Sequence, residues 1–358
     1  MAKSDTKNRR VLSGMRPTGK LHLGHFVGAL ANWVKLQAEY ECFFFVADWH
    51  ALTTDYADTS SVKQSSVDIV LDWLAVGLDP KKSTLFIQSH VPQHAELHLL
   101  LSMITPLGWL ERVPSYKEIR ENVKDKDLST YGFLGYPLLQ SADILIYQAG
   151  YVPVGQDQVA HVELTREVAR RFNSFYPGRP GITKGGGPVF PEPQPLLTKS
   201  PKLPGTDGRK MSKSYGNTVM LTDPEPVVRQ KLKTMVTDPA RVRRTDPGNP
   251  DVCPVGDLHK IFSSADTIAK VDVGCRSAGI GCIECKSWAA DALVQLLAPM
   301  QQRRQQYEND PKLAWDILEA GSQKAQKVAE ATMVEARAAM NMSRDHEPAA
   351  KSVEKKST

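Results

Sequence analysis

Two short segments of the sequence carry side chains suited to phosphate chemistry. The first is His22-Leu23-Gly24-His25, and the second is the lysine and serine run from Lys210 to Ser214. His22 and His25 are three residues apart, so on a helix they share one face with the free backbone N–H groups of its N-terminus. Each segment alone is common in surface loops. Their occurrence together indicates that the chain binds a nucleotide and reacts with it.

Nucleotide chemistry gives these side chains a role. If a triphosphate is attacked at its α-phosphorus, negative charge builds on that group and on the departing pyrophosphate, and fixed hydrogen-bond donors stabilise it. We therefore predict His22, His25, Lys210 and Lys213 as catalytic residues. The Gly- and Pro-rich stretch 178–208 precedes the lysines directly and predicts a mobile loop that closes over the leaving group.

Short apolar strands and helical patterns alternate through the first half of the chain. Strands are predicted around residues 11–12, 42–46 and 85–87, with helices from about Gly24, from about Ser60 and after Pro92. The alternation predicts an α/β fold: a Rossmann-type, doubly wound parallel sheet that binds its ligand at the carboxyl ends of the strands. Beyond Asp223-Pro224 the pattern is mainly helical.

These patterns divide the chain into four segments. Residues 1–10 are predicted as a flexible N-terminus, 11–222 as the catalytic domain with the lysine loop, 223–342 as a mainly helical domain, and 343–358 as a disordered tail. A length of 358 residues suits about two domains.

The composition of the chain indicates where in the cell the protein is expected. The first ten residues are polar and no long apolar run follows them, so we expect neither a secretory signal nor a membrane span. Five cysteines are too few for a disulfide framework and are expected as thiols or metal ligands. The expected location is the cytoplasm, and the net charge of +5 permits a nucleic-acid partner without requiring one.

The two signature segments, in this order, resemble those of the class I aminoacyl-tRNA synthetases. Further motifs resemble the tryptophanyl-tRNA synthetase family more narrowly: Asp48 to Thr53, Gly108 to Arg112, Ala142 to Leu145, and Val152 to Gln158 with His161, Glu163 and Arg166. The resemblance covers the first two-thirds of the chain. It implies activation of tryptophan with ATP and Mg²⁺, transfer to tRNA(Trp), a helical anticodon-binding domain and a homodimer.

The resemblance also implies site residues. ATP would contact Met15, Arg16, Pro17, Thr18, Gly24, His25, Gly155, Gln156, Asp157, Lys210, Met211, Ser212, Lys213 and Ser214. Tryptophan would contact His50, Tyr136, Gln140, Asp143, Val154 and Gln158, with Asp143 accepting the indole N–H.

The residues themselves give independent support for the amino-acid pocket. Tyr136, Gln140, Asp143 and Tyr147 recur at helical spacing as a polar and aromatic stripe on an otherwise apolar helix. A solvent-facing stripe is the commoner cause of such a pattern, but two tyrosines favour a pocket.

Other functions stay open at this point. Gln140 stands where a methionine is frequent, and its spacing to Asp143 also resembles tyrosyl-tRNA synthetases; Gln156 replaces a frequent acid. The alternatives are a tyrosyl-tRNA synthetase, a small nucleotidyltransferase with the same His-x-Gly-His turn, and a non-enzymatic RNA-binding relative. The intact set of His22, His25, Lys210 and Lys213 argues against the last.

Four cysteines gather in the helical half: Cys253, Cys275, Cys282 and Cys285. Four thiolates suit an iron–sulfur cluster or a tetrahedral zinc ion. Some bacterial members of the resembled family carry a four-iron cluster at similar spacing, which favours a [4Fe-4S] cluster over Zn²⁺. Cys42, alone in an apolar strand, is expected in the core.

Basic residues precede the quartet, among them Arg241, Arg243 and Arg244, with Arg229, Lys231 and Lys233 further upstream. Such runs are usually solvated, but beside a metal site they could bind RNA phosphates.

Overall fold

The computed structural model describes residues 9–122, 126–197 and 203–343. Most of the predicted flexible N-terminus (residues 1–8) and of the predicted disordered tail (residues 344–358) lies outside the described residues. Arg10, which the sequence analysis placed in that N-terminus, already belongs to the first strand.

A parallel sheet forms the centre of the N-terminal half, as predicted. Its strands are β1 (Arg10–Met15), β2 (Glu41–Val46), β3 (Ser83–Ile87), β4 (Tyr151–Val154) and β5 (Gln194–Leu197). Their order is β3-β2-β1-β4-β5, and all neighbours run parallel. After β1, the chain adds β2 and then β3 on one side of β1. It then crosses back and adds β4 and β5 on the other side of β1. The switch point between β1 and β4 is where a doubly wound sheet binds its ligand.

The sheet is buried on both faces, and β2 shows this most directly. Phe43 and Phe45 contribute to one apolar cluster, whereas Cys42, Phe44 and Val46 contribute to the other. Because successive side chains of a strand point to opposite faces, each face needs its own layer of helices. Cys42 is 1% exposed, and burial raises the pKa of its thiol to about 12, so the expectation of a core cysteine is confirmed.

The helices of the N-terminal half are α1 (Leu23–His25), α2 (Ala31–Leu36), α3 (Asp48–Asp55), α4 (Val62–Val76), α5 (Gln93–Ser102), α6 (Leu107–Glu111), α7 (Pro114–Asn122), α8 (Tyr131–Ile146) and α9 (Val159–Phe175). Three of them, α1, α4 and α5, begin close to the predicted positions. The first helix is interrupted by a π-helical turn, Phe26–Leu30, directly after His25. Such turns widen a helix locally and are frequent at functional sites; the sequence pattern did not indicate this one.

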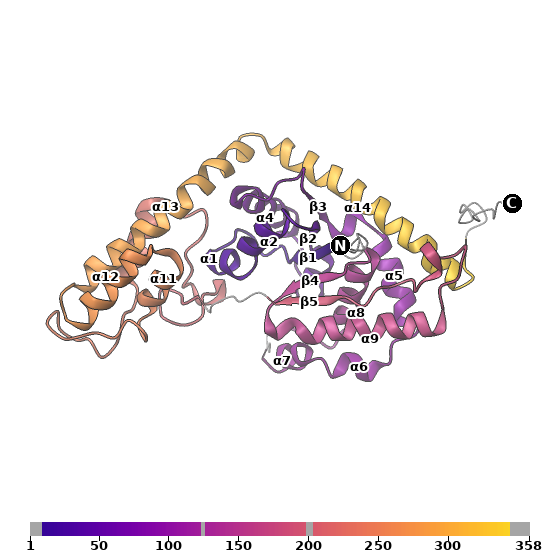
Figure 1. Cartoon of the computed structure of the whole chain (residues 1–358), viewed down its shortest axis with the longest axis horizontal. Coiled ribbons are helices and arrows are strands. Elements are labelled where there is room, and N and C mark those ends of the chain that lie inside the picture. Colours follow the sequence, from indigo (N-terminus) through magenta and orange to yellow (C-terminus); the bar gives the residue numbers. More distant parts are fainter. Residues whose placement is uncertain (1–8, 123–125, 198–202, 344–358) are drawn as a thin grey trace, which may run out of the picture.

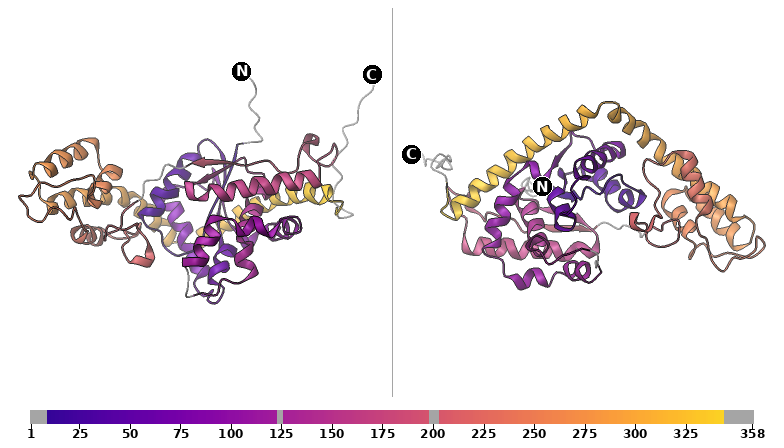
Figure 2. Two further views of the ribbon diagram at one scale, coloured as in Figure 1. Left: turned by 90° about the horizontal axis from the view of Figure 1, so that it is seen from below. Right: turned by 180° about the vertical axis from the view of Figure 1, so that it is seen from behind.

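The C-terminal half is helical and returns to the sheet. It contains α10 (Glu225–Thr234), α11 (Pro254–Phe262), α12 (Ala265–Arg276), α13 (Cys282–Glu308) and α14 (Pro311–Ala339). Figures 1 and 2 show α10 to α12 as a lobe at one end of the molecule, joined to the body by the arch of α13 and α14.

Helix α14 lies on the edge strand β3. A Cβ atom at Gly321 would stand 1.8 Å from the Leu85 carbonyl oxygen, so the helix backbone rests directly on the strand. Arg337, near the end of α14, is 3% exposed and pairs with Glu96 of α5 at 2.7 Å. The edge of the sheet is thereby covered, which removes an open pairing site. The domain boundary at residue 222 stays a prediction.

Candidate active site

A cavity of about 440 Å³ opens at the carboxyl ends of the strands, at the switch point. Met15 at the end of β1 and Val154 at the end of β4 form part of its wall. All residues predicted to bind tryptophan line it, and so do three of those predicted to bind ATP: His50, Tyr136, Gln140, Asp143, Val154 and Gln158, together with Met15, Arg16 and Gly155. The cavity therefore joins the predicted tryptophan residues to three of the predicted ATP residues, whereas the predicted catalytic residues His22, His25, Lys210 and Lys213 do not line it.

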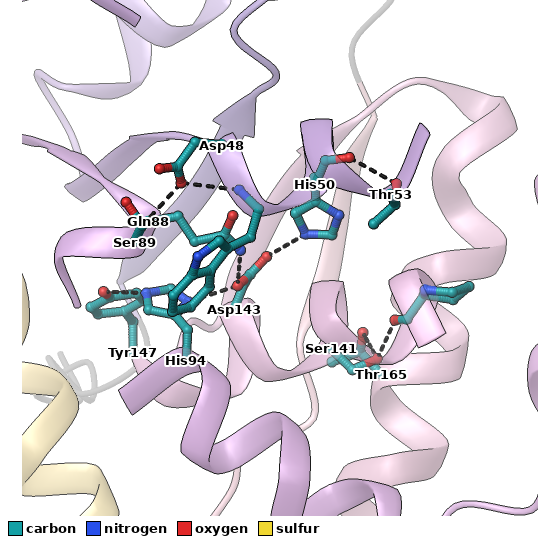
Figure 3. Close-up of polar contacts among 12 residues, drawn as sticks. Asp48, His50, Thr53, Gln88, Ser89, His94, Ser141, Asp143, Tyr147 and Thr165 are labelled. Atoms are coloured by element: carbon teal, nitrogen blue, oxygen red, sulfur yellow. Dashed lines mark hydrogen bonds and ion pairs between the residues drawn. The ribbon is translucent and has the colours of Figure 1, made fainter. Parts of the chain in front are cut away.

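Asp143 is the most enclosed charged group of this cavity, at 1% exposed (Figure 3). Its Oδ2 receives a hydrogen bond from His50 Nε2 at 2.7 Å, and its Oδ1 bonds His94 Nδ1 at 2.6 Å and Gln88 Nε2 at 2.7 Å. Burial alone would raise the pKa of Asp143, but the hydrogen bonds from His50 and His94 outweigh it and hold the pKa well below its ordinary value. Asp143 is an ionised acceptor.

Tyr147 departs from the expected stripe. Its ring is fully buried, and its hydroxyl lies 2.7 Å from His94 Nε2, behind the cavity wall (Figure 3). Helix α8 ends at Ile146, so Tyr147 turns into the core while Tyr136, Gln140 and Asp143 face the cavity.

A second polar network supports Tyr136. The hydroxyl of Tyr136 lies 2.8 Å from Ser115 Oγ, which lies 2.6 Å from Nε2 of His161. Burial lowers the pKa of His161 to about 4, so its imidazole is neutral. The residue lines the cavity, and its Nδ1 atom is buried without a hydrogen-bond partner among the described residues.

The two signature segments lie against each other. His22 pairs with Met220 in an antiparallel bridge, Leu23 N donates to Val219 O at 3.0 Å, and Leu221 N donates to Leu21 O at 2.9 Å. This pairing places the lysine segment beside the first helix.

Lys213 bridges the two segments. Its Nζ donates to the carbonyl oxygens of Thr18 at 2.6 Å and Gly19 at 3.2 Å. Burial lowers the pKa of Lys213, and the carboxylates of Asp72 and Asp68 oppose this. Lys213 is a half-buried cation close to the histidine turn.

The histidines are neutral donors. Burial, with a smaller effect of Lys213, lowers the pKa of His22 to about 4, and burial with the charges of His22 and Lys213 lowers that of His25 to about 3. His22 Nδ1 accepts from Gly24 N at 3.0 Å, and His25 Nδ1 accepts from His22 N at 3.3 Å. With both Nδ1 atoms accepting, each neutral ring carries its proton on Nε2. Each Nε2–H is a donor for a ligand.

The remaining residues of the lysine segment differ in environment. Lys210 and Ser214 are exposed, Met211 is 5% exposed in the apolar core, and the Ser212 and Ser214 hydroxyls lie 2.8 Å apart. Asn217 holds the turn: its Oδ1 accepts from Ser212 N at 2.8 Å, and its Nδ2 donates to Asp207 at 2.7 Å.

Arg16 is paired at the cavity, and the residues predicted to bind ATP other than Met15, Arg16 and Gly155 lie outside its lining. Arg16 donates to Asp55 Oδ2 at 2.8 Å, and Lys126 from the loop before α8 contacts the other oxygen of Asp55. Pro17 is buried, whereas Thr18, Gln156 and Asp157 are exposed.

Several supporting residues escaped the sequence analysis. Asn217 lies three residues after the lysine segment, and only this position in the sequence could have indicated its role. No sequence pattern indicated the roles of Gln88, His94 and Asp72, because their hydrogen-bond partners are distant in sequence. Asp143, for example, is 49 residues from His94.

The four cysteines approach one another at the ends of three helices. Cys253 precedes α11, Cys275 lies in the last turn of α12, and Cys282 and Cys285 lie in the first turn of α13. Burial and the neighbouring thiols raise the pKa of Cys285 to about 12. The donor set fits a metal in kind. However, no three His, Cys, Asp or Glu side chains among the described residues are arranged to hold a metal ion.

The basic residues upstream of the quartet have structural roles that the sequence did not indicate. Arg241 is 9% exposed and donates to Ile280 O at 2.7 Å, with Cys275 Sγ 3.9 Å away. Arg244 donates to Gly279 O at 3.0 Å. Both therefore hold the turn between α12 and α13. Arg243 is exposed on the surface.

Within the described ranges, no helix is both long and apolar enough to cross a membrane.

Comparison with known proteins agrees with this geometry. The family described as tRNA synthetases class I (W and Y) matches residues 3–298. A tryptophan–tRNA ligase of Ralstonia nicotianae is 52% identical, with 93% of this chain and 98% of the relative covered. One of Thermotoga maritima is 55% identical, with 93% and 99% covered.

A solved tryptophanyl-tRNA synthetase of Campylobacter jejuni, complexed with ADP and tryptophan, superimposes with a TM-score of 0.81 at 30% identity, with 93% of this chain and 99% of that chain covered. By the match along most of its length and by these relatives, the chain belongs to the class I tRNA synthetases of the tryptophan and tyrosine family.

Proposed function

We propose that this chain is a tryptophan–tRNA ligase, which activates tryptophan with ATP to tryptophanyl-adenylate and transfers the tryptophanyl group to tRNA(Trp). The single observation that carries the proposal is the cavity. It joins the buried, ionised carboxylate of Asp143 to the Met15–Arg16 end of β1, beside the turn that Lys213 reaches. The relatives that are more than half identical are named tryptophan–tRNA ligases.

In the first step, the tryptophan carboxylate attacks the α-phosphorus of ATP and pyrophosphate leaves. Asp143 accepts the indole N–H, while Tyr136 and Gln158 fix the amino-acid backbone and His50, Gln140 and Val154 shape the pocket. His22 and His25 donate their Nε2–H groups to the phosphates as charge develops there. Lys213 and Lys210 then neutralise the departing pyrophosphate.

ATP lies along the signature segments in this proposal. Its contacts are Met15, Arg16, Pro17, Thr18, Gly24, His25, Gly155, Gln156, Asp157 and the segment from Lys210 to Ser214. Mg²⁺ would accompany the triphosphate, as is usual for phosphoryl groups in proteins. Because no covalent enzyme intermediate is needed, the rate depends on positioning and on electrostatic stabilisation.

The second step requires the tRNA to reach the same cavity. We infer that residues 11–222 are the catalytic domain and that residues 223–342 meet the anticodon stem, with exposed basic residues such as Arg243 contacting phosphates. If aminoacylation by an Arg243→Ala variant matched that of the unmodified enzyme at all tRNA concentrations, Arg243 would have no such contact. Arg244 is unsuitable for this test because it holds the α12–α13 turn.

We further infer that the active form is a cytoplasmic homodimer. Leu99, Met103 and Leu107, at the end of α5 and the start of α6, are 54%, 70% and 61% exposed and form an apolar surface suited to a second subunit. Sedimentation of the Met103→Glu variant should show monomers.

For the cysteine quartet we propose a [4Fe-4S] cluster, with Zn²⁺ as the alternative. The support is the convergence of four thiols at three helix ends, and their side chains would have to rearrange to become ligands. Bound metal would fix the position of α13 relative to α11 and α12. Protein purified without oxygen should contain iron and sulfide and absorb visible light; stoichiometric zinc in a colourless protein would support the alternative.

The decisive test of the function is amino-acid-dependent pyrophosphate exchange. Tryptophan should support exchange between pyrophosphate and ATP, and tyrosine should not. The tyrosyl alternative predicts the reverse preference, and a nucleotidyltransferase predicts no dependence on either amino acid.

A further inference from the structure

The two oxygens of Asp143 differ in how many donors they receive. Oδ1 receives Gln88 Nε2 at 2.7 Å and His94 Nδ1 at 2.6 Å, and both donors are side chains with no exposed surface. Among the described residues, Oδ2 receives one donor, His50 Nε2, at 2.7 Å. A carboxylate offers about four lone-pair sites, two on each oxygen. Oδ1 is therefore filled, and Oδ2 keeps one site for another donor.

The position of that free site follows from its neighbours. His50, bound to Oδ2, lines the cavity, as Asp143 itself does, whereas Gln88 and His94 do not line it. Figure 3 shows the same arrangement: His50 approaches Asp143 from the side opposite to His94 and Tyr147. The unfilled acceptor is thus on the oxygen nearer to the substrate.

His94 keeps this asymmetry because its own protons are fixed. The ionised carboxylate of Asp143 cannot donate, so His94 Nδ1 carries the proton of that bond. In the neutral imidazole, Nε2 then accepts from the Tyr147 hydroxyl at 2.7 Å. The Tyr147 ring is held by stacking on Phe43, with centroids 4.9 Å apart and an interplanar angle of 25°. The hydroxyl, the imidazole and the carboxylate therefore form one directed chain.

We propose that Tyr147 and His94 are positioning residues that reserve Oδ2 of Asp143 for the indole N–H of tryptophan. The inference rests on the proposed function, in which Asp143 is the indole acceptor. Neither residue touches the substrate. Their effect is on selectivity. Without the hydrogen bonds from Tyr147 through His94, the carboxylate of Asp143 can rotate and offer a less well aligned oxygen. The enzyme then loses its preference for a substrate that donates a hydrogen bond at this position.

The test compares two substrates in pyrophosphate exchange, tryptophan and L-3-benzothienylalanine, in which sulfur replaces the indole N–H. Tyr147→Phe removes one oxygen and leaves the ring. We expect the preference for tryptophan, as a ratio of kcat/KM values, to fall about fivefold, mainly through KM for tryptophan, as for the loss of one hydrogen bond. Constants for the analogue should hardly change.

Two substitutions at His94 grade the effect. His94→Asn retains an amide donor near the position of Nδ1 but loses the contact with Tyr147, so its preference should match that of Tyr147→Phe. His94→Leu removes both contacts and should lose more. Should the leucine variant fail to fold, Tyr147→Phe and His94→Asn carry the test, and thermal unfolding of each is recorded alongside.

The controls separate this proposal from the function on which it rests. Tyr40→Phe, a hydroxyl deletion on the far side of the sheet, should leave the preference unchanged. Equal losses for both substrates in Tyr147→Phe, or no loss for either, would overturn the positioning role. If the preference vanishes in Asp143→Asn but persists in Tyr147→Phe, only this inference fails. If the unmodified enzyme shows no preference for tryptophan over the analogue, the indole-acceptor role of Asp143 fails first.

Discussion

At the scale of single residues, the partners of Lys213 indicate how it would act. Its ammonium group is held by the neutral carbonyl oxygens of Thr18 and Gly19 rather than by a carboxylate. A phosphate can displace neutral acceptors more easily than a paired charge, because charge-assisted hydrogen bonds are the stronger ones. Lys213 is thus kept near the histidine turn in a state that a departing pyrophosphate can capture.

Removal of this group should slow chemistry more than it weakens binding. We expect Lys213→Ala to lower kcat for tryptophan-dependent pyrophosphate exchange by about 100-fold or more, as for loss of one fixed donor to a developing charge, with little change in tryptophan affinity measured by equilibrium binding. Lys81→Ala, an exposed lysine before β3, is the control. Equal losses in binding and in kcat would count against a role specific to the transition state.

The neutral histidines predict a pH dependence of stability. Folded His22 remains neutral down to about pH 4, whereas the unfolded chain protonates this residue near pH 6.5. The unfolded state binds more protons in this window, so stability rises with pH there and falls as pH drops from 6.5 towards 4. The contribution of His22 is at most about 3.5 kcal/mol, because the pKa difference is about 2.5 units and each unit corresponds to about 1.4 kcal/mol.

Urea unfolding at several pH values measures this effect. The free energy of unfolding of a His22→Gln variant should fall less steeply between pH 6.5 and 4 than that of the unmodified protein. His90→Gln removes an exposed imidazole and should leave the slope as it was. Parallel curves for all three proteins would show that His22 is not held neutral by the fold.

At the scale of elements, the contact of α14 with β3 depends on one missing side chain. Because a Cβ at Gly321 would stand 1.8 Å from a backbone oxygen of Leu85, Gly321→Ala forces the helix away from the strand. We expect it to lower the free energy of unfolding by about 1–3 kcal/mol, as overpacking does.

A matched substitution isolates the clash. Gly132 lies in the first turn of α8, and a Cβ there would meet nothing within 4 Å. Gly132→Ala should therefore be neutral or stabilise the protein by up to about 1 kcal/mol through helix propensity. Similar destabilisation by both substitutions in denaturant titrations would contradict the clash as the cause.

The elements also show what the sequence could predict. Period-two and helical patterns are local, so β1 to β3 and the start of α1, α4 and α5 were predicted within a few residues. The packing of α14 against the sheet was not predicted. It depends on the missing side chain of Gly321 and on the edge strand β3, which are far apart in sequence. The site shows the same division: the residues predicted to bind tryptophan come from motifs and line one cavity, whereas His94 and Asn217 act through contacts that no pattern encodes.

At the scale of the whole molecule, α13 joins the helical lobe to both signature segments. Its N-terminus carries Cys282 and Cys285, and Gln301 donates to Leu221 O at 3.1 Å, just after the lysine segment. Three residues further, Arg304 pairs with Asp72, which accepts from Leu21 N at 2.7 Å, directly before His22. A displacement of this helix would therefore shift backbone contacts next to both signature segments.

The Arg304–Asp72 pair tests this connection. Both side chains are buried, at 4% and 0% exposed. Arg304→Met leaves the Asp72 carboxylate without its cation, and we expect a loss of about 3–5 kcal/mol in the free energy of unfolding, because an uncompensated buried charge is costly. The Leu21 backbone should also lose its fixed position, so kcat for pyrophosphate exchange should fall although Arg304 is remote from the cavity lining.

A double-mutant cycle separates the effect of the unpaired Asp72 charge from the effect of the lost Leu21 contact. Arg304→Met with Asp72→Asn removes both charges but keeps an amide oxygen for Leu21 N, so much of the stability should return, with a coupling energy of about 1–3 kcal/mol. Exchange activity should return with it if the Leu21 contact is what matters to the active site. Additive losses in stability would show that the two side chains do not act as a pair. If stability returned but exchange activity did not, the loss of activity would come from Arg304 itself rather than from the turn before His22.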